Sequence, residues 1–301
     1  MEEKLHTPVM LTEVLDYLNL APGKIIVDAT VGTAGHSINI IKRILPAGKL
    51  ICIDRDEDSL KRAEERLSDY RKHCEFVYSN FLDLDTVLDS CQVQKVDGFV
   101  FDLGISSYQL EDPERGFSFQ SQGPLDMRLD KNSYISAYDL VNNLNEDEIS
   151  TLLWVFGQER WHNRIARYLV AERQKHPIAT TQQLSDIVVK AIPPRYRGHQ
   201  RIHPATRTFQ AVRIAVNREI EAVDIAINKA IGRLSPAGRI CVIAFHSLED
   251  RAVKVTFRKE AACGRIKIIT PKPLTPSQQE VSLNPSSRSA KFRVAEKIFV
   301  S

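Results

Sequence analysis

The chain has 301 residues, of which 43% are hydrophobic and 26% charged. A chain of this length can bury a full core, and this composition excludes intrinsic disorder and a fibrous repeat. No run approaches the ~18 consecutive apolar residues of a membrane helix, and the N-terminus carries Glu2 and Glu3 where a signal peptide would be basic. We therefore expect a cytoplasmic protein without a membrane partner.

The cysteines are odd in number, widely scattered and without a Cys-x-x-Cys pair. This pattern disfavours a disulfide framework and a structural zinc, and it fits a reducing compartment in which cysteine is a small buried hydrophobe. We expect no bound metal. The cysteines are Cys52, Cys74, Cys91, Cys241 and Cys263.

Positive charge gathers in the second half of the chain, although the net charge is only +3. Residues 156–218 contain twelve lysines and arginines against three acids. Such a block attracts a polyanion, although a solvated helical surface has the same composition. Charge alone leaves both interpretations open.

The first part of the chain alternates short β-branched runs with helical stretches, which is typical of a parallel sheet covered by crossover helices. Helices are expected near 35–44 and 58–70, the second with Asp56 as N-cap. The order predicts a doubly wound α/β fold. The expected strands are 24–29, 49–54, 75–78 and 96–102.

Beyond Asp102 the pattern changes to a loop rich in glycine, proline and serine, followed by helical periodicity. Capping boxes are expected at Asn145 with Glu148 and at Thr180 with Gln183. One long helix is expected from Thr208 to about Leu234, and strands then return at 239–245, 265–269 and 291–299. The α/β domain is therefore expected to be interrupted by a helical domain and completed later.

The turn from Asp28 to His36 connects the first strand to a helix through small residues. Glycines such as Gly32 and Gly35 let a ligand approach backbone N–H groups, and a helix N-terminus favours a carboxylate or phosphate. The turn departs from the dinucleotide fingerprint Gly-x-Gly-x-x-Gly. A connection without a ligand remains an alternative here.

Two further aspartates end later strands of the expected sheet. Asp54 follows the second strand, where an acidic side chain accepts from ribose hydroxyls, and Asp102 ends the fourth at the edge where α/β ligands bind. A nicotinamide or an adenosyl cofactor would both fit this set. Asp54 as a helix cap and Asp102 as a turn former are the alternatives without a ligand.

Six collinear motifs resemble the bacterial family of 16S ribosomal RNA cytosine-N4 methyltransferases, and the similarity runs from His6-Thr7-Pro8-Val9 to Asn284-Pro285 with Arg288. The motifs are 28–36, DLGISS (102–107), ERGFSF (114–119), GPLDMR (123–128), PATRTFQAVR (204–213) and FHSLEDR (245–251). Where the family has two glycines before His36, this chain has Ala34 first. The methyl group of Ala34 should fit there if the φ angle of this residue is negative.

The resemblance implies a Class I, Rossmann-like S-adenosylmethionine-dependent methyltransferase with an inserted all-α domain. It implies methylation of a cytosine N4 in the decoding region of 16S RNA, with the RNA or the small ribosomal subunit as partner. The domains are expected at 1–107 with 208–301, and at 108–207 for RNA recognition. The cofactor contacts implied or expected are Asp28, Gly32, Ala34, Gly35, His36, Asp54, Phe81, Asp102 and Gln109.

An exocyclic cytosine amine is a poor nucleophile, so its N–H groups must meet acceptors while its nitrogen is aligned with the methyl group. Asp102 is the expected organiser, with Ser106 and His246 as further catalytic candidates; His246 as a residue that only fixes its loop is an equal alternative. Phe117 and Phe119 are candidates for stacking on the base, although burial is the commoner role. The expected RNA contacts are Arg197, Arg201, Arg207 and Arg213.

Two rival functions remain at this point. A ribosome-assembly factor without catalysis would keep the basic helical block and lose the aspartates, whereas a nicotinamide-dependent oxidoreductase would need a fuller fingerprint and a partner for hydride transfer. Both rivals fit the sequence less well than a methyltransferase. The sequence leaves open whether the chain forms a homodimer.

Overall fold

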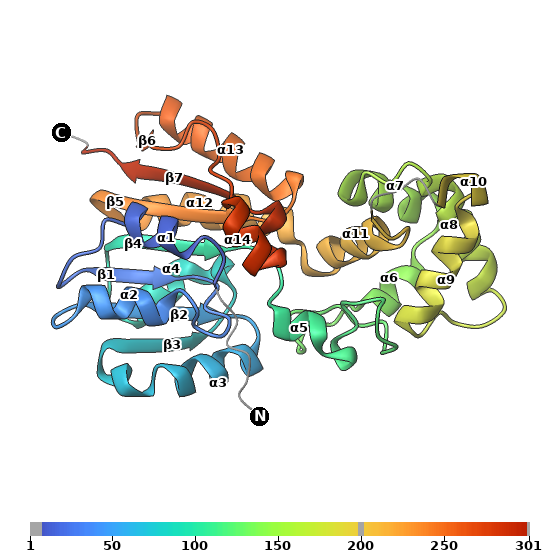
Figure 1. Cartoon of the computed structure of the whole chain (residues 1–301), viewed down its shortest axis with the longest axis horizontal. Helices are drawn as coiled ribbons and strands as arrows, with labels where there is room; N and C mark the ends of the chain where they lie inside the picture. Colours follow the sequence, from blue (N-terminus) through green and yellow to red (C-terminus); the bar gives the residue numbers. More distant parts are fainter. Residues whose placement is uncertain (1–7, 198–201, 300–301) are drawn as a thin grey trace. The chain divides into compact units, whose positions relative to one another are not determined.

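Each run expected to form a strand does so, and the strands join in one seven-stranded sheet (Figure 1). Their bounds agree with expectation to within a few residues, except that β5 begins earlier, at Leu234. The strands are β1 (Ile25–Asp28), β2 (Lys49–Asp54), β3 (Cys74–Tyr78), β4 (Val96–Asp102), β5 (Leu234–Ala244), β6 (Ile266–Ile268) and β7 (Lys291–Lys297).

The strand order is β3-β2-β1-β4-β5-β7-β6. Strands β1 to β5 pair in parallel, and β7 runs antiparallel to both of its neighbours. The order reverses between β1 and β4, and open α/β sheets bind ligands at the carboxyl ends of the strands at such a switch point. The topology therefore selects the ends of β1, β2 and β4 as the place for a site.

Both faces of the sheet are covered, because successive strand residues point to opposite sides and nearly all are apolar. Val27 and Ile51 pack with helices α4, α12 and α13, whereas Ile26 and Leu50 pack with α1, α2 and α3. The bounds of these helices are α1 (Leu11–Tyr17), α2 (Ser37–Ile44), α3 (Glu57–Arg66), α4 (Leu84–Ser90), α12 (Glu219–Arg233) and α13 (Ser247–Ala262). The remaining short elements of this part are η1 (Ser68–His73), η2 (Phe81–Asp83), α14 (Gln278–Leu283) and η4 (Pro285–Ser289).

The computed structural model describes residues 8–197 and 202–299 and divides the chain into two units. Unit 1, Met1–Gly104 with Ile220–Ser301, contains the sheet, and unit 2 is Ile105–Glu219. The interrupted α/β organisation is thus as expected. The observed boundaries lie three residues before and twelve residues after the expected insertion of 108–207 (108 − 105 and 219 − 207).

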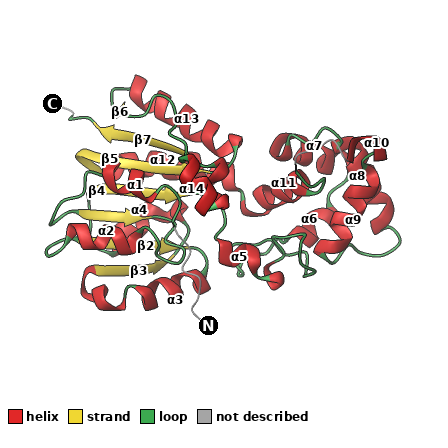
Figure 2. Ribbon diagram, viewed as in Figure 1, coloured by secondary structure: helices red, strands yellow, loops and turns green. Residues whose placement is uncertain are grey.

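Unit 2 is helical in the part of the chain that the structure describes, and its helices enclose a separate apolar core (Figure 2). The capping boxes expected at Asn145 and Thr180 are both present, as is the cap at Asp56 in unit 1. The helices of unit 2 are α5 (Ser107–Glu111), η3 (Pro113–Arg115), α6 (Ala137–Asn143), α7 (Glu146–Gly157), α8 (His162–Arg173), α9 (Thr181–Ala191), α10 (Pro194–Arg197) and α11 (Thr206–Asn217).

The single long helix expected from Thr208 is wrong. The chain forms α11 and then α12, and Arg218 between them has a left-handed backbone with φ of +48°. The apolar stripe of Phe209 and Val212 packs in unit 2, whereas that of Val223 and Ile227 packs in unit 1. Because the two stripes serve different cores, the helix has to end where the units meet in sequence.

All five cysteines are free thiols, and Cys52, Cys74 and Cys241 are buried. Among the described residues, none of the helices has the length and apolar character needed to cross a membrane.

Candidate active site

Three aspartates end neighbouring parallel strands at the switch point of the sheet. Asp28 ends β1, Asp54 ends β2 and Asp102 ends β4. Since parallel strands bring their carboxyl ends to one edge, the three carboxyl groups gather there. All three aspartates thus lie at strand ends of unit 1, and their roles in binding and catalysis stay predictions.

The turn after β1 is held by two of these carboxylates. Asp28 Oδ2 accepts from Ser37 Oγ at 2.7 Å, and Asp28 Oδ1 accepts from the Thr30 backbone N–H at 3.3 Å. Asp54 accepts from the backbone N–H groups of Gly32 and Asp56 at 2.8 and 2.9 Å. A carboxylate has about four acceptor positions, so Asp54 retains capacity for two donors of a ligand.

Ala34 adopts a left-handed backbone with φ of +60°, so the condition of a negative φ is not met. Its methyl group is fully buried in the apolar cluster of α1 and α2. Gly35 follows with little free space, because a Cβ there would lie 3.1 Å from Pro8 Cβ. Alanine thus fits the turn sterically and carries backbone strain.

Replacing Ala34 by glycine should leave the free energy of unfolding within about 0.5 kcal/mol of wild type. Relief of left-handed strain gains ~1 to 2 kcal/mol, which the loss of a buried methyl group (~0.8 kcal/mol) and the greater entropy of an unfolded glycine (~0.5 to 1 kcal/mol) offset. Ala34→Val should instead cost about 2 kcal/mol or more, because a β-branched residue tolerates positive φ poorly. Urea unfolding of the three proteins measures both; a stabilised valine variant would contradict the strain.

Asp102 is the least satisfied of the three carboxylates. Its Oδ1 is buried without a hydrogen-bond partner among the described residues, and its Oδ2 lies 3.7 Å from His36 Nδ1. His36 Nε2 is 2.9 Å from the Val9 carbonyl oxygen, which fixes the ring. The Asp102 backbone N–H donates to Thr30 Oγ1 at 2.7 Å. A fixed carboxylate with an open oxygen fits a ligand or substrate that donates a hydrogen bond.

Burial raises the pKa of all three carboxyl groups to about 6. The Asp102 pKa is also influenced by His36, which lowers it, and by the charges of Asp28 and Glu249, which raise it. Three carboxyl groups that titrate close to neutral pH are typical of a functional edge rather than of ordinary strand ends.

The contribution of Asp28 to stability should fall as the pH rises from about 4 to about 6. Its folded pKa lies above that of an unfolded aspartate, so the folded state binds more protons in this window and loses stability as they leave. Asp28→Asn mimics the protonated form and can still accept from Ser37. Its free energy of unfolding relative to wild type should therefore rise between pH 4.5 and 7; a difference independent of pH would contradict the raised pKa.

Phe81 also belongs to this edge of unit 1. It begins the short helix η2 after β3, is 6% exposed, and meets Phe101 of β4 edge-on at a centroid distance of 6.0 Å. The Arg55 guanidinium lies 5.8 Å from its ring centroid. This geometry suits an apolar wall beside the aspartates.

Ser106 and Gln109 lie in unit 2 and cap helix α5 reciprocally. The Gln109 backbone N–H donates to Ser106 Oγ at 3.2 Å, and the Ser106 backbone N–H donates to Gln109 Oε1 at 3.0 Å. Both side chains thus have a local structural role. Their roles in catalysis and in cofactor binding stay predictions.

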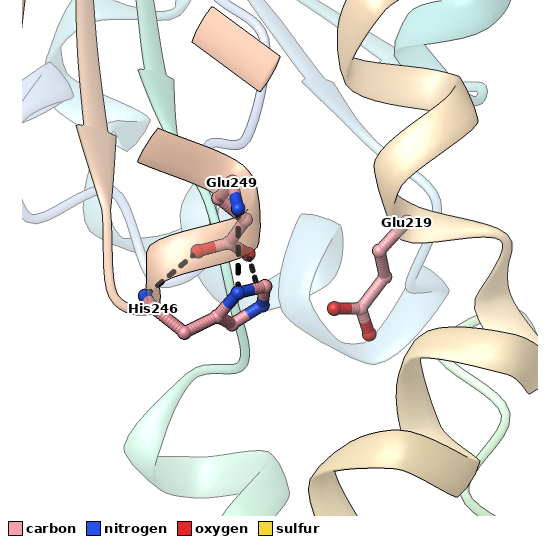
Figure 3. A group of neighbouring side chains, drawn as sticks. All are labelled: Glu219, His246 and Glu249. Carbon is pink, nitrogen blue, oxygen red and sulfur yellow. Dashed lines mark hydrogen bonds and ion pairs between the residues drawn. The ribbon is translucent and has the colours of Figure 1, made fainter. Parts of the chain in front are cut away.

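His246 follows β5 as the N-cap of α13 and forms a capping box with Glu249 (Figure 3). Glu249 Oε1 lies 3.2 Å from His246 Nε2, and Glu249 Oε2 accepts from the Phe245 backbone N–H at 2.8 Å. Asp250 binds Arg293 Nε at 2.6 Å. These contacts favour the loop-fixing alternative for His246. Glu219, also drawn, begins α12.

The four arginines expected to bind RNA differ in what the structure says of them. Arg207 is exposed on α11, with a long contact of 3.5 Å to the Gln158 carbonyl oxygen. Arg213 is mostly buried and forms two 3.0 Å bonds to Glu219, which neutralises its charge and speaks against a phosphate-binding role. Arg197 ends α10, and Arg201 lies outside the described residues.

Phe117 is 6% exposed in the core of unit 2, which matches the commoner role. Phe119 stacks on His203 at a centroid distance of 4.5 Å. Sequence reasoning missed Thr30 and Ser37, which hold Asp102 and Asp28. Their position in the sequence could have indicated this role, because both are hydroxyl residues within or just after the turn that begins at Asp28.

The strand order and the antiparallel β7 define a Rossmann-like, doubly wound α/β fold. The model of the MraW methylase family matches residues 3–298, and the chain belongs to this family. Relatives named ribosomal RNA small subunit methyltransferase H include those of Clostridioides difficile (strain 630), Halothermothrix orenii and Finegoldia magna. The first two are 44% identical and the third 43%, with 97% of this chain and 98 to 99% of theirs covered.

Proposed function

We propose that this protein transfers the methyl group of S-adenosylmethionine to N4 of a cytidine in the decoding region of 16S ribosomal RNA. The proposal is supported by the methylase family, by relatives named for the small ribosomal subunit, and by the aspartate-rich edge of the sheet. The observation that carries it is the open carboxylate oxygen of Asp102, which can accept from an amine.

The residues of unit 1 fit the cofactor by their chemistry. Asp54 can accept from two ribose hydroxyl groups while its two backbone donors hold it in place. Ala34, Gly35 and His36 bring the start of α2 to the turn, where a helix N-terminus favours a carboxylate. When bound, S-adenosylmethionine supplies an electrophilic methyl group on a positively charged sulfur.

Asp102 is proposed to accept an N–H of the cytosine amine, which moves electron density toward the nitrogen and prepares it for attack. With a pKa of about 6, Asp102 is largely ionised above pH 7 and can also take the proton that leaves the amine. His36, fixed by the Val9 carbonyl group, positions Asp102 and lowers its pKa.

The test is to incubate the protein with labelled S-adenosylmethionine and either small ribosomal subunits or bare 16S RNA, and to map the labelled nucleoside by mass spectrometry. Label in a single N4-methylated cytidine is expected. Label in another nucleoside would overturn the target, and subunit binding without label would indicate an assembly factor. We also propose a cytoplasmic location and consider a homodimer. Cell fractionation tests the location, and light scattering during size-exclusion chromatography measures the oligomeric state.

Arg207 is proposed to contact phosphate, with Arg197 and Arg201 as further contacts predicted from the sequence. Arg207→Glu should weaken RNA binding about tenfold at low salt and reduce the salt dependence, because one phosphate contact is lost. Filter binding over a salt series measures this. Affinity that equals wild type at every salt concentration would contradict the contact, and the exposed Arg258 of α13, changed to glutamate, is the matched control.

A further inference from the structure

Arginines and aromatic rings interleave at one place in unit 2. The rings of Trp161, before α8, and Tyr196, in α10, have centroids 5.1 Å apart and an interplanar angle of 48°. The Arg160 guanidinium lies 5.5 Å from the Trp161 centroid and 5.7 Å from that of Tyr196, and Arg195 lies 4.8 Å from Tyr196. We call these four residues the arginine–aromatic cluster.

The rings are anchored while the charges are exposed. Trp161 and Tyr196 are half-buried against the core of unit 2, and the Trp161 backbone N–H donates to Glu159 Oε1 at 2.8 Å. Arg160 and Arg195 are exposed. The cluster therefore presents exposed cationic groups beside half-buried rings.

Neither arginine of the cluster forms an ion pair within residues 8–197 and 202–299. Other cations of the same unit are paired: Arg167 lies 3.5 Å from Glu146, and Lys190 lies 3.1 Å from Glu172. The cluster thus keeps two positive charges that no carboxylate compensates.

A guanidinium carries five N–H donors, so one that lies over an aromatic ring still has donors for a ligand. Donors in this arrangement match phosphate oxygens in pairs, and their fixed position lowers the entropy lost on binding. The same pattern recurs along α8, where Arg164 lies 5.4 Å from the Tyr168 centroid and donates to its hydroxyl group at 3.2 Å. Trp161, Arg164 and Tyr168 share one helix face by their spacing.

We propose that the arginine–aromatic cluster binds the phosphodiester backbone of the RNA substrate, at a place separate in sequence from Arg207. This inference rests on the proposed function and adds a docking surface to it. RNA is favoured over an anionic lipid surface because relatives of this chain are named for the RNA of the small ribosomal subunit, and because arginines beside aromatic rings are typical of RNA-binding surfaces.

The test compares Arg160→Gln/Arg195→Gln with the control Arg167→Gln/Lys190→Gln, which removes the same charge from cations that are already paired. Binding of each protein to small ribosomal subunits is measured over a salt series, and S-adenosylmethionine affinity separately. The cluster variant should bind about tenfold more weakly or worse, and its slope of log K against log salt should be smaller by about 1.4 for two lost phosphate contacts. Its KM for subunits should rise with little change in kcat or in cofactor affinity.

Equal losses in both double variants would overturn the proposal in favour of general electrostatic attraction, and unchanged binding in the cluster variant would overturn it outright. Wild-type binding to vesicles of phosphatidylglycerol that is lost only in the cluster variant would assign the surface to lipid instead. The binding measurement does not depend on methyl transfer. Absence of label in cytidine would therefore refute the proposed function, while the effect of the cluster variant on subunit binding could still be interpreted.

A second readout follows Trp161 itself. The chain has two tryptophans, so Trp154→Phe leaves Trp161 as the only one. Addition of 16S RNA to this variant should change the tryptophan emission, and Arg160→Gln/Arg195→Gln in the same background should reduce the change. Emission that does not respond to saturating RNA would contradict contact at the cluster.

Discussion

Replacing Asp102 by asparagine should lower kcat at least 100-fold, which corresponds to about 3 kcal/mol of transition-state stabilisation. Asparagine keeps the shape of the side chain and can still accept a hydrogen bond, but it can neither take a proton nor balance positive charge on the nitrogen. The carboxylate oxygen concerned is buried and has no partner among the described residues, so no neighbouring group replaces it.

Asp54→Asn is the control variant that separates an effect on catalysis from an effect on cofactor binding. Asp54 is proposed to hold the cofactor, so its variant should raise the Kd for S-adenosylmethionine with a smaller change in kcat at saturation. Calorimetry with the cofactor and single-turnover methylation of subunits separate the two effects. Should Asp102→Asn weaken cofactor binding while kcat at saturation equals wild type, Asp102 would be a binding residue only.

Gly116→Ala should destabilise unit 2 by roughly 3 kcal/mol or more, because overpacking adds to backbone strain. Gly116 has φ of +68°, and a Cβ there would lie 2.2 Å from the Pro124 carbonyl oxygen. The motifs ERGFSF and GPLDMR cross at this point, and the Met127 backbone N–H donates to the Arg115 carbonyl oxygen at 3.0 Å. An added methyl group would push the two segments apart.

Gly264→Ala is a matched control, since Gly264 has nearly the same φ of +69° and nothing within 4 Å of its would-be Cβ. This variant should lose only the ~1 kcal/mol that left-handed alanine costs. Urea unfolding measures the loss in each variant, and limited proteolysis shows whether the helical unit loosens in Gly116→Ala, while Gly264→Ala lies in unit 1 and should leave the helical unit unchanged. Equal losses at both positions would show that the close approach at Gly116 is absent in solution.

The sheet could be predicted from the sequence because its signals are local. Parallel strands buried on both faces are apolar throughout, as in Lys49–Asp54, and the bounds of such runs are short and clear. The caps at Asp56, Asn145 and Thr180 are equally local, since a short polar side chain and a residue three positions later determine them.

The break at Arg218 could not be predicted, because the apolar period continues across it and arginine carries no preference for positive φ. The stripe divides between two cores, and this division is a tertiary property. The φ of Ala34 was likewise hidden, since the family's glycine at this position tolerates either sign.

For the site, the aspartates at strand ends followed from strand order, whereas the capping roles of Ser106 and Gln109 were not predicted from the sequence, and loop fixing by His246 was one of two alternatives. Histidine is an unusual N-cap, so His246 with Glu249 gave no capping signal. The pairing of Arg213 with Glu219 was equally invisible, because six residues of sequence across a helix break do not predict a contact.

The place of β7 within the sheet affects how the protein is synthesised. This strand lies between β5 and β6 in the sheet, yet it follows the other six strands of that sheet in sequence. On a translating ribosome, the helical unit is therefore complete while β7, the strand that pairs with β5, has not yet been made. The sheet is complete only when β7 emerges, so until then β5 exposes an unpaired edge to which a chaperone or a second nascent chain can bind.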